Sequence, residues 1–355
     1  MRLSQRDNTM DVKLDFDDVL IVPQFTDITS RSQVTVTQQL TGRWGASITG
    51  VPIVAANMDG VGTFSMNHAL SQFGVFTAIV KHHTIEDWET ELSSSTSNIQ
   101  TNDKLCITIG MSDADLEQAI TITSLLKSHG MDTPKIVIDV ANGYMNPFYD
   151  FITKVRDNIP NSFIIAGTVV TPEAVERIIT CGADLARVGI GTGAVCTTRR
   201  VAGVGYPQFS ALLECTSAAE NVRGGVVSDG GCVYPGDFSK AYGAGAHMVM
   251  AGSIFAGHDE SEQDIYDGKV RFYGMSSSEA QEKHGAIKKY RSSEGRIVEI
   301  PYKGPVEHTI ANILGGIRSA CAYVNADTIS QLHEKVKFIR VNSQLNTSLE
   351  RYTVG

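Results

Sequence analysis

FIIAGTVVTPEAVERIITCGADLARVGI (residues 163–190) is the stretch of sequence that decides the fold. It holds two short apolar runs, FIIAG (163–167) and LARVGI (185–190), on either side of a segment with helical periodicity, Pro172–Cys181. Continuous apolar runs are typical of parallel strands that are buried on both faces of the sheet. The stretch therefore predicts a strand, a helix and a second strand parallel to the first.

The same alternation extends in both directions along the chain. Further segments with helical periodicity are Asp113–Ser128, Pro207–Asn221 and a final helix, Val306–Tyr323. Eight strand units favour a closed (β/α)8 barrel over an open doubly wound sheet, and we expect residues 1–355 to form one such domain. The other six apolar runs are VPIVAA (51–56), VFTAIV (75–80), LCITIG (105–110), KIVIDV (135–140), GVVSD (225–229) and HMVMAG (247–252).

Polar residues and glycines follow these strands, as in DVANGY (139–144), GIGTG (189–193) and SDGG (228–231). The carboxyl ends of barrel strands carry the active site, so we expect these residues to gather at one rim. The segment 257–305 is rich in Gly, Ser and charge and follows the eighth strand. It is expected to fold over the rim as a flap, although a solvated hairpin would have the same composition.

Composition excludes several classes of function. The net charge of −9 argues against sequence-independent binding of nucleic acid. The six cysteines form no CxxC pair and have no zinc spacing, which is typical of a reduced cytosolic protein. No apolar run has the length of a membrane span, and the first sixteen residues have no secretory h-region. We expect a soluble cytoplasmic protein without a membrane partner.

Two loops after the seventh and eighth strands predict a phosphate site. SDGGCVYPGD (228–237) and AGSIFAG (251–257) occupy the positions at which barrels of this kind often bind phosphate. Gly230, Gly231 and Gly252 would let backbone N–H groups approach an anion. Asp229 would repel phosphate, so a sugar hydroxyl is its better partner. A phosphorylated small molecule is therefore the expected ligand.

Cys196 is the candidate nucleophile. It lies in GIGTGAVCTTRR (189–200), where glycines precede it and two arginines follow. A thiol attacks as the thiolate, and nearby cations and backbone N–H groups favour that form. Cys106, Cys181 and Cys215 lie within apolar patterns and are expected to be structural.

The motifs together resemble a known family. The loop GIGTGAVCTTR, with GVGYPQ (203–208) after it, resembles the cysteine loop shared by IMP dehydrogenases and GMP reductases. The other segments that agree, in order, are DFDDVLIVP (15–23), AANMDGVGTFSM (55–66), DVANGY (139–144), SDGGCVYPGD (228–237), FYGMSS (272–277) and YRSSEG (290–295). This ordered set spans about Leu14 to Arg340, nearly the whole chain, and is specific.

Three differences favour the reductase branch of the family. The dehydrogenases usually carry paired CBS domains after the second strand, and the chain between Lys81 and the third strand is too short for them. Their cysteine loop typically reads CIT, whereas this loop reads CTTR. Their flap carries an Arg-Tyr pair that activates water, whereas this flap has the order Tyr290-Arg291. A dehydrogenase without CBS domains and a non-catalytic purine nucleotide-binding protein stay open as alternatives.

The resemblance implies a reaction in which NADPH reduces GMP to IMP with release of ammonia. Cys196 would attack the purine C2 and form a covalent thioimidate when ammonia leaves. The family's Thr–Glu pair, which handles protons at the departing ammonia, corresponds to Thr198 and Glu294. An amine leaves only when protonated, so an acid must lie close to it.

The resemblance also implies binding residues. The nucleotide set is Asp229, Gly230, Gly231, Gly252, Gly274, Met275, Ser276, Arg291, Ser292, Ser293 and Gly295. The NADPH set is Ser30, Arg31, Lys81, Asp139, Val140, Ala141, Tyr290 and Ser319, in which Arg31 and Lys81 are candidates for the 2′-phosphate. A potassium-type ion would take Gly191, Gly193 and Cys196, with Arg199 beside them. The family also implies a homotetramer.

Four positions depart from the usual pattern of the family. Thr192 stands in place of a proline or serine, Ala194 in place of a serine, Thr168 in place of an asparagine, and Ala251 in place of a glycine. Since none of them is Cys196, Thr198 or Glu294, we expect activity with altered affinity at most.

Overall fold

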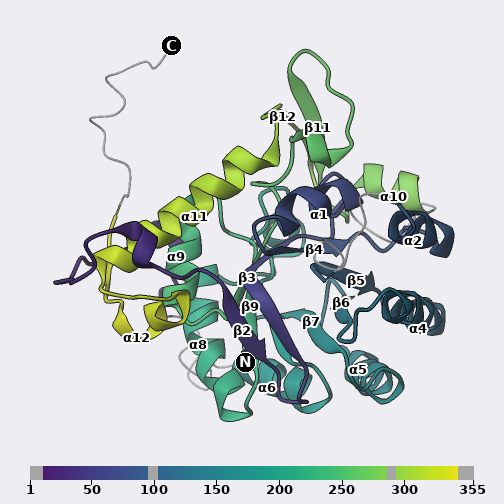
Figure 1. Cartoon of the computed structure of the whole chain (residues 1–355), viewed down its shortest axis with the longest axis horizontal. Coiled ribbons are helices and arrows are strands. Elements are labelled where there is room, and N and C mark those ends of the chain that lie inside the picture. The colour runs from purple at the N-terminus through teal and green to yellow at the C-terminus, as the bar shows by residue number, and fades with distance from the viewer. Residues whose placement is uncertain (1–10, 95–102, 286–292, 343–355) are drawn as a thin grey trace, which may run out of the picture.

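The computed structural model describes residues 11–94, 103–285 and 293–342. Its centre is a closed barrel of eight parallel strands, in which each strand pairs with the next and β10 pairs with β3 (Figure 1). The predicted (β/α)8 barrel is therefore confirmed. The strands are β3 (Ser47–Ala55), β4 (Val75–Ile79), β5 (Leu105–Ile109), β6 (Lys135–Asp139), β7 (Phe163–Val169), β8 (Leu185–Val188), β9 (Gly225–Asp229) and β10 (Met248–Ala251).

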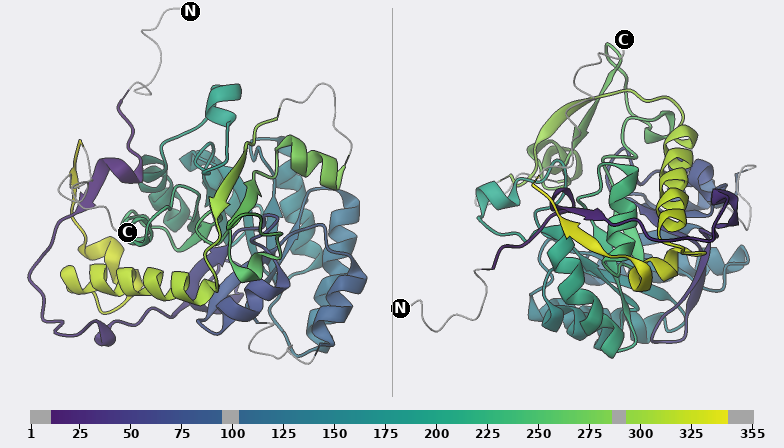
Figure 2. Two further views of the ribbon diagram at one scale, coloured as in Figure 1. Left: turned by 90° about the horizontal axis from the view of Figure 1, so that it is seen from above. Right: turned by 90° about the vertical axis from the view of Figure 1, so that its left-hand side faces the viewer.

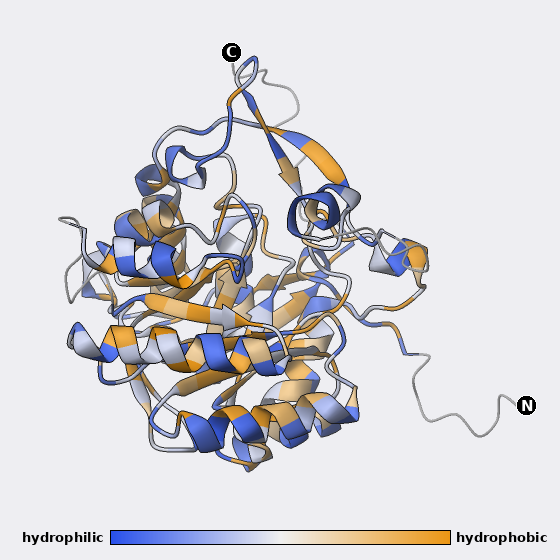
Figure 3. Ribbon diagram, turned by 90° about the vertical axis from the view of Figure 1, so that its right-hand side faces the viewer, coloured by the Kyte–Doolittle hydropathy of each residue, from blue (hydrophilic) through white to orange (hydrophobic). Residues whose placement is uncertain are grey.

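Helices surround the barrel, as the views in Figure 2 show. They are α1 (Phe64–Ser71), α2 (Ile85–Leu92), α4 (Asp113–Ser128), α5 (Asn146–Asn158), α6 (Pro172–Thr180), α8 (Gln208–Asn221), α9 (Pro235–Gly243) and α11 (Val306–Tyr323). In Figure 3 the strands are mostly hydrophobic, whereas the helices carry both hydrophobic and hydrophilic residues, as expected for helices with one face on the core. Of the helices in the described residues, none is long and apolar enough to span a membrane.

Local chemistry explains why the predicted helices begin where they do. Ser112 caps α4, because its hydroxyl accepts the Asp115 N–H (3.2 Å) while the Asp115 carboxylate accepts the Ser112 N–H (2.8 Å). Pro172 opens α6, where its fixed φ fits the first turn and its missing N–H has no cost. Both helices therefore begin at the residues that the sequence predicts, Asp113 and Pro172.

The sequence did not predict three short strands near the ends of the chain and before the barrel. β2 (Gln38–Thr41) pairs antiparallel with β3, and β1 (Val19–Ile21) pairs with β13 (Phe338–Arg340) from the far end of the chain. Each has only three or four residues, too few for periodicity to show. The remaining short elements are η2 (Phe16–Asp18), η3 (Arg31–Gln33), α7 (Thr198–Val201), η5 (Ile329–Gln331) and α12 (Leu332–Lys335).

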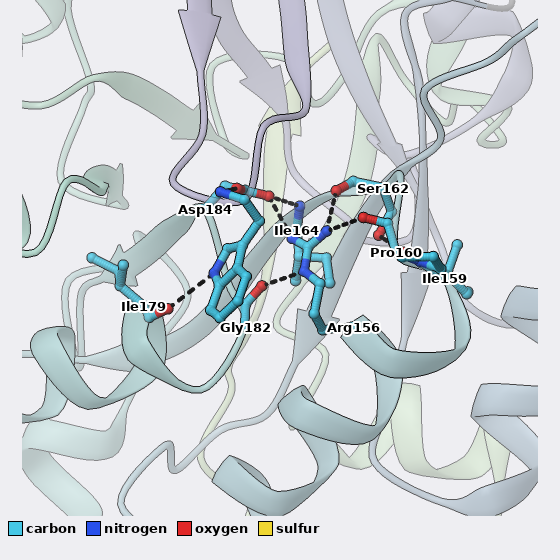
Figure 4. Close-up of polar contacts among 9 residues, drawn as sticks. Arg156, Ile159, Pro160, Ser162, Ile164, Ile179, Gly182 and Asp184 are labelled. Carbon is cyan, nitrogen blue, oxygen red and sulfur yellow. Dashed lines mark hydrogen bonds and ion pairs between the residues drawn. The ribbon is translucent and has the colours of Figure 1, made fainter.

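A buried ion pair closes the barrel at the amino-terminal ends of β7 and β8 (Figure 4). Arg156 Nη2 lies 2.7 Å from Asp184 Oδ2, and the same oxygen accepts the Ile164 N–H at 2.8 Å. The other guanidinium N–H groups donate to the carbonyls of Pro160, Ser162 and Gly182. This face of a barrel serves stability, because the chemistry lies at the opposite rim.

The segment after β10 forms an antiparallel hairpin of β11 (Lys269–Tyr273) and β12 (Ile297–Pro301), with η4 (Asp259–Ser261) before it and α10 (Ser278–His284) inside it. The hairpin projects from the barrel in Figure 1. Its inner side is buried at Val270 and Phe272, so the hairpin is only partly solvated. The assignment of 257–305 as a flap within one domain stays a prediction. We refer below to residues 269–301 as the hairpin segment.

Candidate active site

A pocket of about 280 Å³ opens at the carboxyl ends of the barrel strands. Its walls come from the loops after β3, β6, β8, β9 and β10, and from the hairpin segment. The pocket therefore lies at the rim on which the sequence places its glycines and polar residues. Backbone segments that are far apart in the chain meet here because the barrel closes.

Cys196 is the first member of a short hydrogen-bonded chain in this pocket. Its Sγ lies 3.2 Å from Thr198 Oγ1, and the Thr198 hydroxyl donates to Glu294 Oε2 at 2.7 Å. All three residues line the pocket. A thiol, a hydroxyl and a carboxylate in contact can move a proton from the sulfur side to the carboxylate and back.

Backbone pairing holds this chain together. Cys196 and Gly295 form an antiparallel bridge, in which the Thr197 N–H donates to Glu294 O at 2.8 Å and the Arg296 N–H donates to Val195 O at 2.9 Å. This backbone pairing places Glu294 beside Thr198 and so brings its carboxylate close to the Cys196 thiol. Ser293 lies beside this bridge, and neither Ser293 nor Gly295 lines the pocket.

The other cysteines differ from Cys196 in their surroundings. Burial raises the pKa of Cys106, Cys215 and Cys321 to about 12, and it raises the pKa of Cys232 well above its usual value. These thiols stay protonated and are poor nucleophiles. Cys232 lines the pocket but is 5% exposed.

The loops after β9 and β10 form a glycine-lined cradle in the pocket. Gly230 and Gly231 have φ of +87° and +84°, a region that side chains other than glycine rarely adopt. A Cβ on Gly230 would lie 2.5 Å from Thr192 Oγ1, and one on Gly252 would lie 2.8 Å from Met58 Sδ. The backbone conformation therefore favours glycine at 230 and 231, whereas a side chain at 252 would displace Met58.

Arg187 is a pocket residue that the sequence reasoning missed. Its side chain is 6% exposed, and its Nη1 and Nη2 lie 2.6 Å from Asp139 Oδ1 and 2.7 Å from Asp229 Oδ2. Burial opposes the charge, but the two carboxylates outweigh it and raise the pKa of Arg187. A charged residue in the middle of the apolar run LARVGI was the signal that could have identified it.

A second pocket, of about 310 Å³, adjoins the first. Lys81 and His82 line it, together with His284 from α10. Val140, like Asp139 and Ala141, lines the first pocket. The two pockets share the residues Asn57, Asp139, Ala141, Met275 and Ser276. Two ligands could therefore meet at the shared wall.

The structure separates the residues expected around NADPH into two groups. Lys81, Asp139 and Ala141 line the second pocket, whereas Ser30, Arg31 and Ser319 line a pocket of about 240 Å³ between η3 and α11. These two pockets share no residue. Tyr290, Arg291 and Ser292 lie outside the described residues.

The expected cation ligands lie on one turn before α7. Gly191 has φ +76°, and a Cβ there would lie 2.7 Å from Arg199 Cγ, so the loop packs against that side chain. The Gly193 carbonyl accepts the Cys196 N–H at 3.0 Å, which leaves one lone pair free. In the described part of the chain, His, Cys, Asp and Glu side chains form no cluster that could hold a metal.

The departures from the family pattern have local roles. The Thr192 hydroxyl donates to Asp229 O at 2.9 Å, and the Ala194 carbonyl accepts Arg296 Nη2 at 2.7 Å. Thr168 and Ala251 line the pocket. The contact made by Thr192 ties the cysteine loop to the loop after β9.

Comparison with known proteins identifies the family of the chain. The IMP dehydrogenase / GMP reductase domain matches residues 13–348. The chain belongs to this family. It is 47% identical to GMP reductase 2 of Mus musculus over 342 residues, which cover 95% of this chain and 96% of that protein.

Two further relatives in the family are about equally similar over nearly their full lengths. GMP reductase of Caenorhabditis elegans is 48% identical over 340 residues, covering 94% of this chain and 93% of that protein. GMP reductase of an Escherichia coli strain is 46% identical over 342 residues, covering 95% and 97%. The match includes both the barrel and the hairpin segment.

Proposed function

We propose that this chain is a GMP reductase, which uses NADPH to convert GMP to IMP and ammonia in purine nucleotide interconversion. The observation that carries the proposal is the contact chain from Cys196 through Thr198 to Glu294 in the rim pocket. Full-length similarity to proteins named GMP reductase supports it. The family also contains dehydrogenases, so the site chemistry has to separate the two activities.

The chain's own residues would act in two stages. In the first stage, Cys196 Sγ bonds to the purine C2, the C2–N bond breaks, and ammonia leaves with a proton delivered through Thr198 and Glu294. NADPH would supply the hydride that reduces C2 in the second stage. The C2–S bond then breaks, the thiolate returns to Cys196, and IMP is released.

Recognition of the nucleotide would use the glycine cradle and the hairpin segment. The backbone N–H groups near Gly230, Gly231 and Gly252 suit a phosphate, and Asp229 suits the ribose hydroxyls. Gly274, Met275 and Ser276 would contact the base side of GMP. Ser293 and Gly295, together with the undescribed Arg291 and Ser292, complete the proposed nucleotide set.

The cofactor is proposed to lie in the second pocket, where Lys81 provides a cation beside Asp139 and Ala141. Val140 and Tyr290 belong to the same proposed set. Because Ser30, Arg31 and Ser319 line a different pocket, they would reach a cofactor from a neighbouring copy of the chain. This division fits the proposed homotetramer, in which Arg31 of one copy and Lys81 of another would face one dinucleotide.

A potassium-type ion is proposed at the carbonyls of Gly191, Gly193 and Cys196, next to Arg199. The free lone pair of the Gly193 carbonyl supports it, because monovalent cations bind carbonyl oxygens. Such an ion would hold the cysteine loop in shape. Thermal melting in potassium and in choline chloride at equal ionic strength tests it, since only potassium should raise the melting temperature.

The deciding experiment incubates the purified protein with GMP and NADPH and follows both NADPH absorbance and ammonia. We expect loss of NADPH with one ammonia per turnover. No reaction here, combined with NAD reduction on IMP, would make the chain a dehydrogenase without CBS domains. Tight GMP binding without turnover in either direction would favour a nucleotide sensor. A cytoplasmic location is part of the proposal.

A further inference from the structure

We infer that Asp59 is a positioning residue: it clamps the segment Tyr273–His284 onto the barrel rim and so fixes the wall shared by the two pockets. The inference rests on the proposed function, since it assigns a role in aligning the two substrates. Asp59 follows β3, in the loop NMDG (57–60), and its side chain is 5% exposed. The carboxylate does not line either pocket.

One carboxylate oxygen receives donors from both ends of the clamped segment. Tyr273, the last residue of β11, donates its hydroxyl to Asp59 Oδ2 at 2.8 Å, and His284, the last residue of α10, contacts the same oxygen through Nε2 at 2.7 Å. Lys283 Nζ lies 3.3 Å away from it. A buried carboxylate with several donors is a strong contact, because each hydrogen bond is charge-assisted.

The middle of the segment is attached to the same residue. The Asp59 N–H points at Met275 Sδ at 3.3 Å, and Met275 and Ser276 line both pockets. In the described part of the chain, every side-chain hydrogen bond or ion pair between 273–284 and the barrel ends on Asp59. This residue therefore sets where the shared wall stands relative to the rim.

A stacked pair of rings supports the clamp from the neighbouring strand. His82, in the loop after β4, stacks on His284 with centroids 3.7 Å apart and an interplanar angle of 5°. The stack orients the His284 ring so that Nε2 faces Asp59. The ends of β3 and β4 and the segment 273–284 thus form one contact unit.

The electrostatics agree with an ionised clamp. Burial opposes ionisation of Asp59, but the hydrogen bonds from His284 and Tyr273 and the charge of Lys283 outweigh it and lower its pKa. Burial and the hydrogen bond to Asp59 raise the pKa of Tyr273, which stays a donor. The carboxylate remains charged and the phenol remains neutral throughout the neutral pH range.

The test uses Asp59→Asn, which keeps the size but removes the charge, and Tyr273→Phe, which removes one donor and is the milder variant. Glu279→Gln is the matched control, because Glu279 lies in the same segment but its ion pair, with Arg271 of β11, does not involve Asp59. For each variant, KM for GMP, KM for NADPH, kcat and hydrogen exchange of residues 273–284 without ligands are measured.

For Asp59→Asn we expect both KM values to rise about tenfold, kcat to change less, and exchange protection to fall in 273–284 while the barrel strands keep theirs. Tyr273→Phe should show the same pattern to a smaller degree, and Glu279→Gln should match the wild type. Unchanged KM values and unchanged exchange in both clamp variants would overturn the inference. So would a uniform loss of protection over the whole barrel, which marks a purely structural residue.

Hydrogen exchange separates this inference from the proposed activity. If the wild type has no reductase activity, the exchange pattern still shows whether Asp59 holds the segment, and GMP binding by calorimetry replaces KM. An inactive wild type with the expected exchange pattern would reject the reductase but keep the clamp.

Discussion

The Thr198 hydroxyl donates to Glu294 Oε2 at 2.7 Å, across 96 residues of chain. The contact joins the first residue of α7 to the hairpin segment. It depends on the bridge between Cys196 and Gly295, because that pairing sets the distance of Glu294 from the thiol. The proposed proton path is therefore only as stable as the docking of the hairpin segment.

Removal of the thiol should separate binding from turnover. Cys196→Ala is expected to abolish NADPH oxidation with GMP, because Cys232, the other cysteine that lines the pocket, is buried, while GMP affinity by calorimetry changes less than about threefold. Cys181→Ala is the control, since Cys181 is also partly exposed but lies at the end of α6. Residual turnover by Cys196→Ala near the wild-type rate would rule out the covalent step.

Removal of the proton path should lower kcat rather than affinity. Thr198→Val and Glu294→Gln are each expected to lower kcat by about 10²–10⁴-fold, the usual contribution of general acid–base catalysis. The double variant should be little worse than the worse single one, because the two residues act in series. Effects that multiply in the double variant would show that the two groups act independently. Pre-steady-state measurement of ammonia release identifies the affected step.

Arg187 should matter for both stability and binding. Arg187→Met leaves Asp139 and Asp229 facing each other without a cation, so we expect the free energy of unfolding to fall by about 3 kcal/mol. Arg187→Lys keeps the charge but cannot span both carboxylates, so a smaller loss of about 1–2 kcal/mol should accompany weaker binding of GMP and NADPH. Arg271→Lys, at an exposed arginine, should change neither. Urea unfolding and calorimetry measure both quantities, and wild-type affinity in Arg187→Lys would contradict a bridging role.

His82 should titrate far below an ordinary histidine. Loss of solvation, with repulsion from His284 and Lys81, lowers its pKa to about 4, while Asp59 acts in the opposite direction. An NMR titration, with the signal assigned from His82→Gln, should show this midpoint. Asp59→Asn should lower the midpoint further, and His284→Gln should raise it. A midpoint near 6.5 in the wild type would show that the stacked arrangement does not persist in solution.

The same shift gives the sign of a stability effect. The unfolded chain has the higher histidine pKa, about 6.5, so it takes up the proton first as the pH falls. The contribution of His82 to stability is complete above about pH 6.5 and decreases as the pH falls to about 4. Because the side chain is exposed, we expect less than about 1 kcal/mol, measured as the difference from His82→Gln in urea unfolding.

The barrel was predictable from sequence because its strands are short, mostly apolar runs. An error of one or two residues in where a predicted strand begins or ends does not change the number of strands. β1 and β13 were not predictable, since Val19 pairs with Arg340 only after the barrel has brought the chain ends together. The candidate site divides in the same way. Cys196 and the glycine loops are local signals, whereas the partners of Arg187, which are Asp139 and Asp229, come from two other strands.

The relation of Asp59 to His284 could not be seen in the sequence either. The two residues are 225 positions apart, and each has ordinary neighbours in its own segment. The same limit applies to Ser30, Arg31 and Ser319, which the family resemblance groups with Lys81 but which line another pocket. Only the structure shows that Lys81 lines one pocket while these three residues line another, so that they could not bind one ligand together within a single copy.

Strand β8 has an ion pair near each end. Asp184, directly before the strand, pairs with Arg156. Arg187, its third residue, pairs with Asp139 and Asp229. One pair is sealed at the closed end of the barrel, and the other faces the pocket. Substitutions at Asp184 and at Arg187, three positions apart, should therefore have different effects: the first should affect stability, and the second should also affect binding. A laboratory evolution experiment that selects for heat resistance should therefore retain Arg156 and Asp184, whereas one that selects for a new substrate has to retain Arg187 while the pocket around it changes.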